Sequence, residues 1–216
     1  MRRMSRHPVW VRVSHWITTA CVVTLAYTGV VILMAHPRLY WGEAGNDLTP
    51  ALIELPISRN YKHGGFDAPV RFFEDRATPV SASRTYNIFN KNGWGRSLHF
   101  LAAWCLVVPG VAYVVAGIVG GHFRRRFFSG YGRLQGLTYT LVVFVAAPLI
   151  VLTGLAMSPA ITAAFPFLLR VFGGQQSART IHFFAFLALS LFVVGHVVMV
   201  VRSGVVQQLR AMTIGE

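Results

Sequence analysis

The chain is poor in acidic residues and in cysteine. It has 7 Asp and Glu against 20 Lys and Arg, a formal net charge of +13. Its long hydrophobic segments contain no acidic residue, which argues against ion-coupled transport and proton pumping. The two cysteines, Cys21 and Cys105, lie inside hydrophobic segments without a CxxC or CxxCH context. We therefore expect no disulfide framework, zinc site or covalent c-type haem, and interpret both cysteines as packing residues.

The usual patterns of catalysis and of nucleic-acid binding are also missing. The sequence has no nucleophile–base constellation, no phosphate-binding loop and no paired carboxylates. Its basic residues gather at the ends of hydrophobic segments, not on a soluble face with interleaved aromatics, so the positive charge does not indicate nucleic acid. Any redox chemistry is therefore expected to reside in a bound cofactor.

Hydrophobic sequence is abundant. Hydrophobic residues make up 54% of the 216 residues, and the mean hydropathy is +0.53. Four segments, at about 13–35, 98–119, 134–157 and 181–201, are long enough to cross ~30 Å of hydrocarbon. A shorter apolar run over 160–172 is broken by Pro166 and is interpreted as a reentrant or interfacial piece. The prediction is one all-α membrane domain over 1–216, a four-helix transmembrane bundle with a long loop over about 36–96.

Arginine placement predicts the orientation of this bundle. The short hydrophilic segments carry Arg2, Arg3, Arg6 and Arg12 at the amino terminus, Arg124, Arg125, Arg126 and Arg133 between spans two and three, and Arg202 and Arg210 in the tail. The long loop is nearly balanced, with eight basic and six acidic residues. The positive-inside rule then predicts a multi-pass protein of the bacterial inner membrane, with both termini cytoplasmic and the long loop periplasmic.

Four histidines near the ends of the spans are candidate ligands. His182 and His196 are fourteen residues apart on the fourth span, so they return to nearly the same helix face and lie roughly 21 Å apart along its axis. His15 opens the first span at the inner side and His99 the second at the outer side. Depth therefore pairs His15 with His196, and His99 with His182. Polar groups in hydrocarbon are costly and usually functional, and two such pairs suit two bis-histidine haems.

Other residues near these depths are weaker candidates. Gly29 lies fourteen positions after His15, on the same face and at the outer depth, where a macrocycle needs space beside the backbone. Glycine also serves close helix packing, so both roles remain open. The other histidines, His7, His36, His63 and His122, are interpreted as solvated or interfacial. Among them His36 is the strongest competitor, because it lies at the outer depth.

Several stretches together resemble a known family. WVRVSHW, GWGRSLHFLAAW, LTGLAMSP and RTIHFFAFLALSLFVVGHV resemble the bacterial/Ni-hydrogenase-type di-haem cytochrome b superfamily. HPRLYWGEAG most resembles its thiosulfate reductase cytochrome b branch, a membrane-anchor subunit. The resemblance implies two haem b groups, with His15, His99, His182 and His196 as iron ligands. It further implies quinone chemistry near the inner haem and a catalytic partner, often a molybdopterin enzyme, on the outer face.

A quinone site is predicted at the inner surface. Ser14 lies at the start of the first span, and Tyr131, Arg133 and Gln135 lead into the third. Arg133 and Gln135 can donate hydrogen bonds to a quinone carbonyl, and Tyr131 is a candidate proton relay. Alternatively, Arg133 only anchors the interface, as the positive-inside rule requires.

The long loop bears on the function. Its aromatic residues, Tyr40, Trp41, Tyr61, Phe66, Phe72, Phe73, Tyr86, Phe89 and Trp94, suit a cap over the outer haem, a docking face or an interfacial belt. The favoured function is an electron-transfer subunit between the quinone pool and a periplasmic oxidoreductase. Alternatives are a self-sufficient superoxide:quinone oxidoreductase, which a compact basic loop would favour, and a haem-free membrane scaffold.

Overall fold

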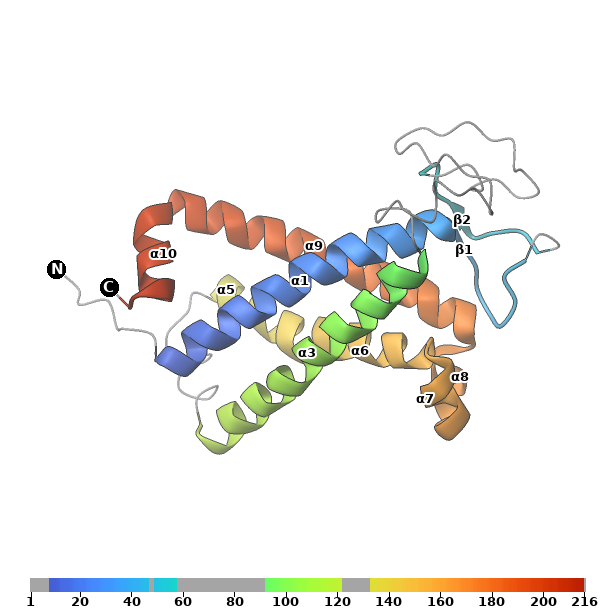
Figure 1. The fold of residues 1–216 in the computed structure, drawn as a ribbon, viewed down its shortest axis with the longest axis horizontal. Helices are drawn as coiled ribbons and strands as arrows, with labels where there is room; N and C mark the ends of the chain where they lie inside the picture. The colour runs from blue at the N-terminus through green and yellow to red at the C-terminus, as the bar shows by residue number, and fades with distance from the viewer. Residues whose placement is uncertain (1–7, 47–48, 58–91, 122–132, 216) are drawn as a thin grey trace.

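The computed structural model describes residues 8–46, 49–57, 92–121 and 133–215 of the chain. Within them, four helical segments are long and apolar enough to cross a membrane. They are α1 (Val9–Ala35), α3 (Asn92–Val119), a third segment ending in α6 (Ala147–Ala156), and α9 (Gln175–Arg202). The start of α1 and the carboxyl-terminal end of the described residues lie at one end of the bundle, and the short strands lie at the other (Figure 1). The predicted all-α membrane bundle is confirmed.

The helices begin earlier than the predicted spans. α1 begins at Val9 rather than near residue 13, and α9 begins at Gln175 rather than near residue 181. Polar residues from Gln175 to Thr180 continue α9 beyond its apolar segment, because backbone hydrogen bonding does not require an apolar side chain. The added turns matter at the strand-bearing end, which we call the outer end after the predicted orientation. There Ser177, Arg179 and Thr180 contact the loop that follows α1.

The third span is not a uniform α-helix. It starts as α5 (Arg133–Leu141), widens into a π-helical turn over Val142–Ala146, and continues as α6. Pro148 follows the wide turn and has no N–H to offer an α-helical carbonyl. Wider i→i+5 bonding before the proline accommodates that missing donor.

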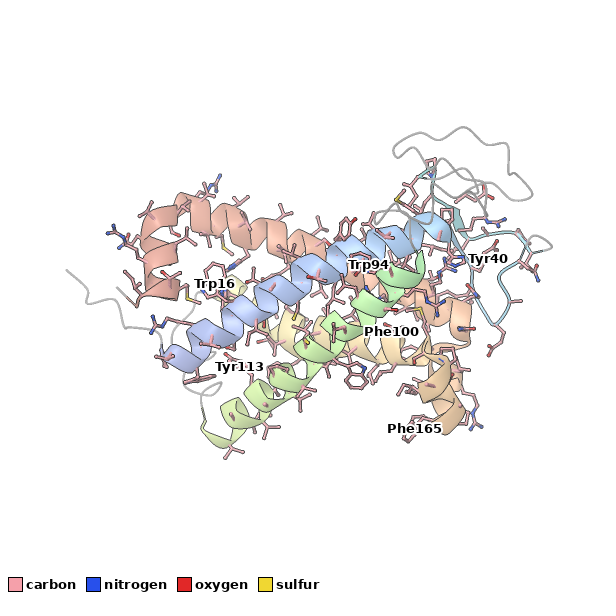
Figure 2. All side chains as sticks on the ribbon, viewed as in Figure 1. Trp16, Tyr40, Trp94, Phe100, Tyr113 and Phe165 are labelled. Carbon is pink, nitrogen blue, oxygen red and sulfur yellow. The ribbon has the colours of Figure 1, made fainter. Side chains whose placement is uncertain are left out.

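The apolar run after α6 forms two short helices at the strand-bearing end. These are α7 (Pro159–Ala164) and α8 (Phe167–Phe172), and Pro166 caps the second. Leu168 of α8 packs with Ala156 and Ala178 in a small buried cluster. Phe165 and Trp94 lie toward this end and Trp16 toward the other (Figure 2), as aromatic residues do at the two interfaces of a membrane protein.

The loop after α1 folds back onto the start of α9. Strand β1 (Arg38–Leu39) pairs antiparallel with β2 (Ile53–Glu54). Beyond β1, the carbonyl of Tyr40 accepts from the Thr180 hydroxyl at 2.6 Å, and the Gly42 amide donates to the Ser177 hydroxyl at 2.7 Å. Gly174 has φ +116°, and a Cβ there would collide with the Gly42 carbonyl. We call residues 36–46 the outer strap, because these bonds tie it to α9.

A final helix, α10 (Val205–Thr213), was not predicted from the sequence. It turns back from α9 toward the start of α1 (Figure 1). The Arg12 guanidinium donates to the Thr213 carbonyl at 2.6 Å, and the Trp16 indole donates to the Met212 carbonyl at 2.9 Å. Orphan carbonyls at the end of α10 are thereby satisfied by α1 side chains. The bonds place α10 beside the inner histidines.

The four long segments pack mainly as two pairs. α1 lies along α3, and α6 lies along α9. Each pair consists of two antiparallel helices that meet near the strand-bearing end (Figure 1). The candidate ligands bridge the pairs, because His15 and His99 belong to the first pair and His182 and His196 to the second.

Candidate functional site

The outer histidines, His99 and His182, face each other between α3 and α9. Their ring centroids are 6.4 Å apart, and the ring planes are inclined by 58°. Each is the eighth residue of its helix, about 10 Å along the axis from the helix start. Depth matching from the sequence paired the same two residues.

His99 is held from α1 by a threonine. The Thr28 side-chain oxygen lies 2.9 Å from His99 Nδ1, and Thr28 is 0% exposed. Its hydroxyl also donates within α1 to the Thr24 carbonyl, at 2.7 Å. A hydroxyl has a single hydrogen. Because that hydrogen is given to Thr24, Thr28 accepts the second bond and His99 Nδ1 donates it.

His182 has the same support from α6. The Thr153 side-chain oxygen lies 3.0 Å from His182 Nδ1 and donates to the Leu149 carbonyl at 2.7 Å. Thr153 is likewise 0% exposed. Both outer histidines therefore carry their proton on Nδ1 and keep the Nε2 lone pair free of that proton. This is the tautomer that a metal ligand needs, and the partner of its other nitrogen normally fixes it.

A glycine follows each threonine. A Cβ on Gly29 would lie 3.7 Å from His99 Cε1, and one on Gly154 would lie 3.4 Å from His182 Cε1. Alanine at either glycine would only touch the neighbouring histidine ring, whereas a longer side chain would overlap with that ring. Gly29 was predicted from the sequence; Thr28, Thr153 and Gly154 were not. The signal was available as a Thr-Gly dipeptide repeated in two spans.

The inner histidines form a second pair with different support. The ring centroids of His15 and His196 are also 6.4 Å apart, with planes inclined by 52°. Phe192 stacks on His196 at 6.2 Å and 24°, and Tyr139 meets Phe192 edge-on at 5.9 Å. In the described ranges, the His196 ring forms no hydrogen bond like those to Thr28 and Thr153. Aromatic packing therefore orients His196, whereas threonines orient the outer pair.

The donor set of each pair fits haem. Two metal–nitrogen bonds of about 2 Å, plus the distance from each ring nitrogen to its ring centre, place two axial imidazoles about 6 Å apart, close to the observed 6.4 Å. Across the described ranges, no three His, Cys, Asp or Glu side chains gather into a site for a bare metal ion. Haem iron already has four porphyrin nitrogens as ligands and needs only two more. Each histidine pair can supply these two.

The remaining predicted residues lie elsewhere. His36 caps the end of α1, and its carbonyl accepts from Arg179. The Ser14 hydroxyl donates to the Val11 carbonyl at 3.0 Å, within its own helix. Arg133 and Gln135 lie in the first turn of α5, but their side chains fall outside the description. Tyr131, His7, His63 and His122 also lie outside the described residues.

Two comparisons with known proteins bear on the family. A family model described as prokaryotic cytochrome b561 matches residues 6–215. The chain is also 27% identical, over 218 aligned residues, to the putative protein-methionine-sulfoxide reductase subunit YedZ1 of Azospira oryzae. That alignment covers 90% of this chain and 89% of the relative. The cytochrome b resemblance noted in the sequence is confirmed by the first match.

Proposed function

Because the chain belongs to the prokaryotic cytochrome b561 family, we propose that it is a di-haem cytochrome b that passes electrons between a quinone and a redox partner. Membrane electron transfer with haem b is the coarse function of this family. The finer proposal is that His15 and His196 hold an inner haem, and His99 and His182 an outer one. The observation that carries it is the pair of matched 6.4 Å imidazole contacts.

The arrangement suits electron transfer across a membrane. His182 and His196 lie on one helix, roughly 21 Å apart along its axis. Bound haems would supply one-electron redox centres at two depths. The chain contributes the ligands, the Nδ1 acceptors Thr28 and Thr153, and an apolar surrounding that excludes water. The residues that contact the histidines differ between the two sites, and such differences can give two haems different redox potentials.

The partner is proposed to be a catalytic oxidoreductase on the outer face. The similar protein from Azospira oryzae carries the name of a subunit of a putative protein-methionine-sulfoxide reductase. That name favours a subunit role over a self-sufficient superoxide:quinone oxidoreductase. A molybdopterin enzyme, such as the superfamily resemblance implies, is the proposed class of partner. Placement in the bacterial inner membrane, with both termini cytoplasmic, belongs to the same proposal.

The haem content tests this proposal. We expect purified protein to show a reduced b-type spectrum with about two haems per chain, because the structure offers two bis-histidine pairs. A pyridine haemochrome assay against protein concentration measures the ratio. A ratio near one haem per chain would show that one of the two histidine pairs does not bind haem. An absence of haem would support the scaffold alternative.

The quinone is proposed to bind near the inner pair. Ser14 lies next to His15, and Arg133 and Gln135 open the third span at the end where α1 starts. A quinone there would reach water for proton exchange and lie beside the inner histidines. Since Ser14 already donates to Val11, its hydroxyl oxygen remains available as an acceptor for a quinol.

Substitution of the two donors tests the quinone site. In Arg133→Ala and Gln135→Ala proteins, we expect quinone-linked haem oxidation to slow by about tenfold, because each loses a hydrogen bond to the quinone carbonyl. Stopped-flow spectroscopy measures the rate, with Gln207→Ala on α10 as a control at the same end. Wild-type rates and unchanged inhibitor affinity in both variants would contradict this site and favour one under the outer strap.

A further inference from the structure

An arginine precedes three of the four candidate ligands at the same spacing. The pattern Arg-x-x-His occurs at Arg12 with His15, at Arg96 with His99, and at Arg179 with His182. Residues three apart lie on one helix face, about 4.5 Å apart along the axis. Because α3 and α9 both begin at the strand-bearing end, Arg96 and Arg179 lie on the outer side of their histidines.

The charges of both outer arginines act on one residue, His36, although the arginines belong to different helices. Burial lowers the pKa of His36, and the positive charges of Arg179, Arg96 and Arg38 lower it further. Arg96 and Arg179 thus serve the same end of α1, where Arg96 is exposed. One Arg179 nitrogen donates to the His36 carbonyl, which leaves most of its five donors for other acceptors.

A buried hydroxyl lies at the same place. Tyr40 of the outer strap is only 4% exposed, and its hydroxyl has no hydrogen-bond partner among the described residues. It is close enough to Arg179 for the two to interact electrostatically. In Figure 2, nitrogen-bearing side chains gather beside the labelled Tyr40. A buried hydroxyl donor beside the Arg179 guanidinium suits an anionic oxygen as acceptor.

The described part of the outer end does not supply that oxygen. Its acidic side chains, Glu43 and Glu54, are exposed, and no carboxylate contributes to the shift of His36. The third Arg-x-x-His differs in this respect, because Arg12 donates to the Thr213 carbonyl at 2.6 Å. Arg179, unlike Arg12, thus keeps donors for an acceptor that the described residues do not supply, because only one of its nitrogens is used on the His36 carbonyl.

We propose that Arg96, Arg179 and the Tyr40 hydroxyl bind the propionate carboxylates of the outer haem. This rests on the proposed function, in which His99 and His182 ligate that haem. Haem b carries two propionates on one edge. A haem held by His99 and His182 would lie about one helical turn from Arg96 and Arg179, so these arginines could reach its propionates. Arginine is suited to this role because its planar donors match a carboxylate.

The reduction equilibrium of the outer haem tests the assignment. Arginine charge disfavours the ferric form, and unpaired propionates favour it, so loss of the arginines should favour oxidation. In the double variant Arg96→Gln/Arg179→Gln, we expect the equilibrium to shift about tenfold toward the oxidised form, which is a fall of about 59 mV for a one-electron couple. Tyr40→Phe should shift it in the same direction by less. Potentiometric titration of the full-length protein measures both.

Arg170→Gln is the matched control, because Arg170 is an exposed arginine of α8 at the same end. In a second experiment, full-length protein made in haem-deficient cells is loaded with haem b or with haem b dimethyl ester, in which both propionates are uncharged. We expect wild type to retain the ester less well, and the double variant to retain both alike.

The outcomes separate this inference from the proposed function. No outer haem component in wild type would overturn the proposed function itself. An outer component whose potential and retention in the double variant equal those in Arg170→Gln would overturn the propionate assignment alone. Equal behaviour of haem b and its ester in wild type would also overturn it, and would assign the cluster to a carboxylate of a partner protein instead.

Discussion

His182→Ala protein is expected to contain about one haem per chain instead of about two, and to lose the same redox component as His99→Ala. The two imidazoles face each other at 6.4 Å, so removal of either leaves the iron with one axial ligand and an open, weakly held site. His15→Ala and His196→Ala should instead both lose the other component. Potentiometric titration of the four variants, with haemochrome quantification, measures which component disappears.

His36→Ala provides the control for this series. His36 lies at the outer end and was the strongest competing histidine, but it caps α1 and its carbonyl accepts from Arg179. We therefore expect it to keep both haems. If His15→Ala and His99→Ala lost the same component, the pairing would be wrong, and if His36→Ala alone lost the outer one, the ligand assignment would be wrong.

Gly154→Leu is expected to abolish most outer-haem binding without preventing insertion of the protein in the membrane. A Cβ at this position would already lie 3.4 Å from His182 Cε1, so the rest of a leucine side chain must displace the ring. Displacement from a packed position costs about 1–3 kcal/mol, equivalent to about a 5- to 150-fold loss of haem affinity. Haem titration of full-length protein in detergent, followed at the Soret band, measures this.

Two variants separate the effect of space from the effect of the hydrogen bond. Gly110→Leu on α3 is the matched control, since a Cβ there has nothing within 4 Å, and it should bind both haems normally. Thr153→Val keeps the volume but removes the acceptor of the His182 proton, 3.0 Å away, and should cost about tenfold in outer-haem affinity. Equal affinities in Gly154→Leu and Gly110→Leu would contradict the close approach of His182.

The fold class and the candidate ligands could be predicted from the sequence because they depend on local pattern. Apolar segments of sufficient length predict four spans regardless of how these pack. The fourteen-residue spacing of His182 and His196 follows from helix geometry alone. Pairing by depth needed only the orientation given by arginines, and the ring contacts join the same residues. Haem ligation by these pairs, and the quinone site, remain predictions.

The supporting residues depended on the tertiary structure. Thr28 and Thr153 are ordinary span residues until two helices bring each within about 3 Å of a histidine nitrogen 71 or 29 positions away. Gly154 likewise acquires a role only because His182 packs against it. Helix periodicity fixes which residues share a face, but it does not fix which helix lies opposite.

The ends of the molecule show the same division. Hydropathy could not predict α10, because a nine-residue polar–apolar helix falls below the length of a span and is stabilised by Arg12 and Trp16 from the other terminus. Nor could it place Tyr40 beside Arg179. Sequence alone therefore determined the class of protein, the spans and the candidate ligands, since these follow from composition and helix spacing. Tertiary packing decided which residues support the ligands, because such contacts join segments distant along the chain.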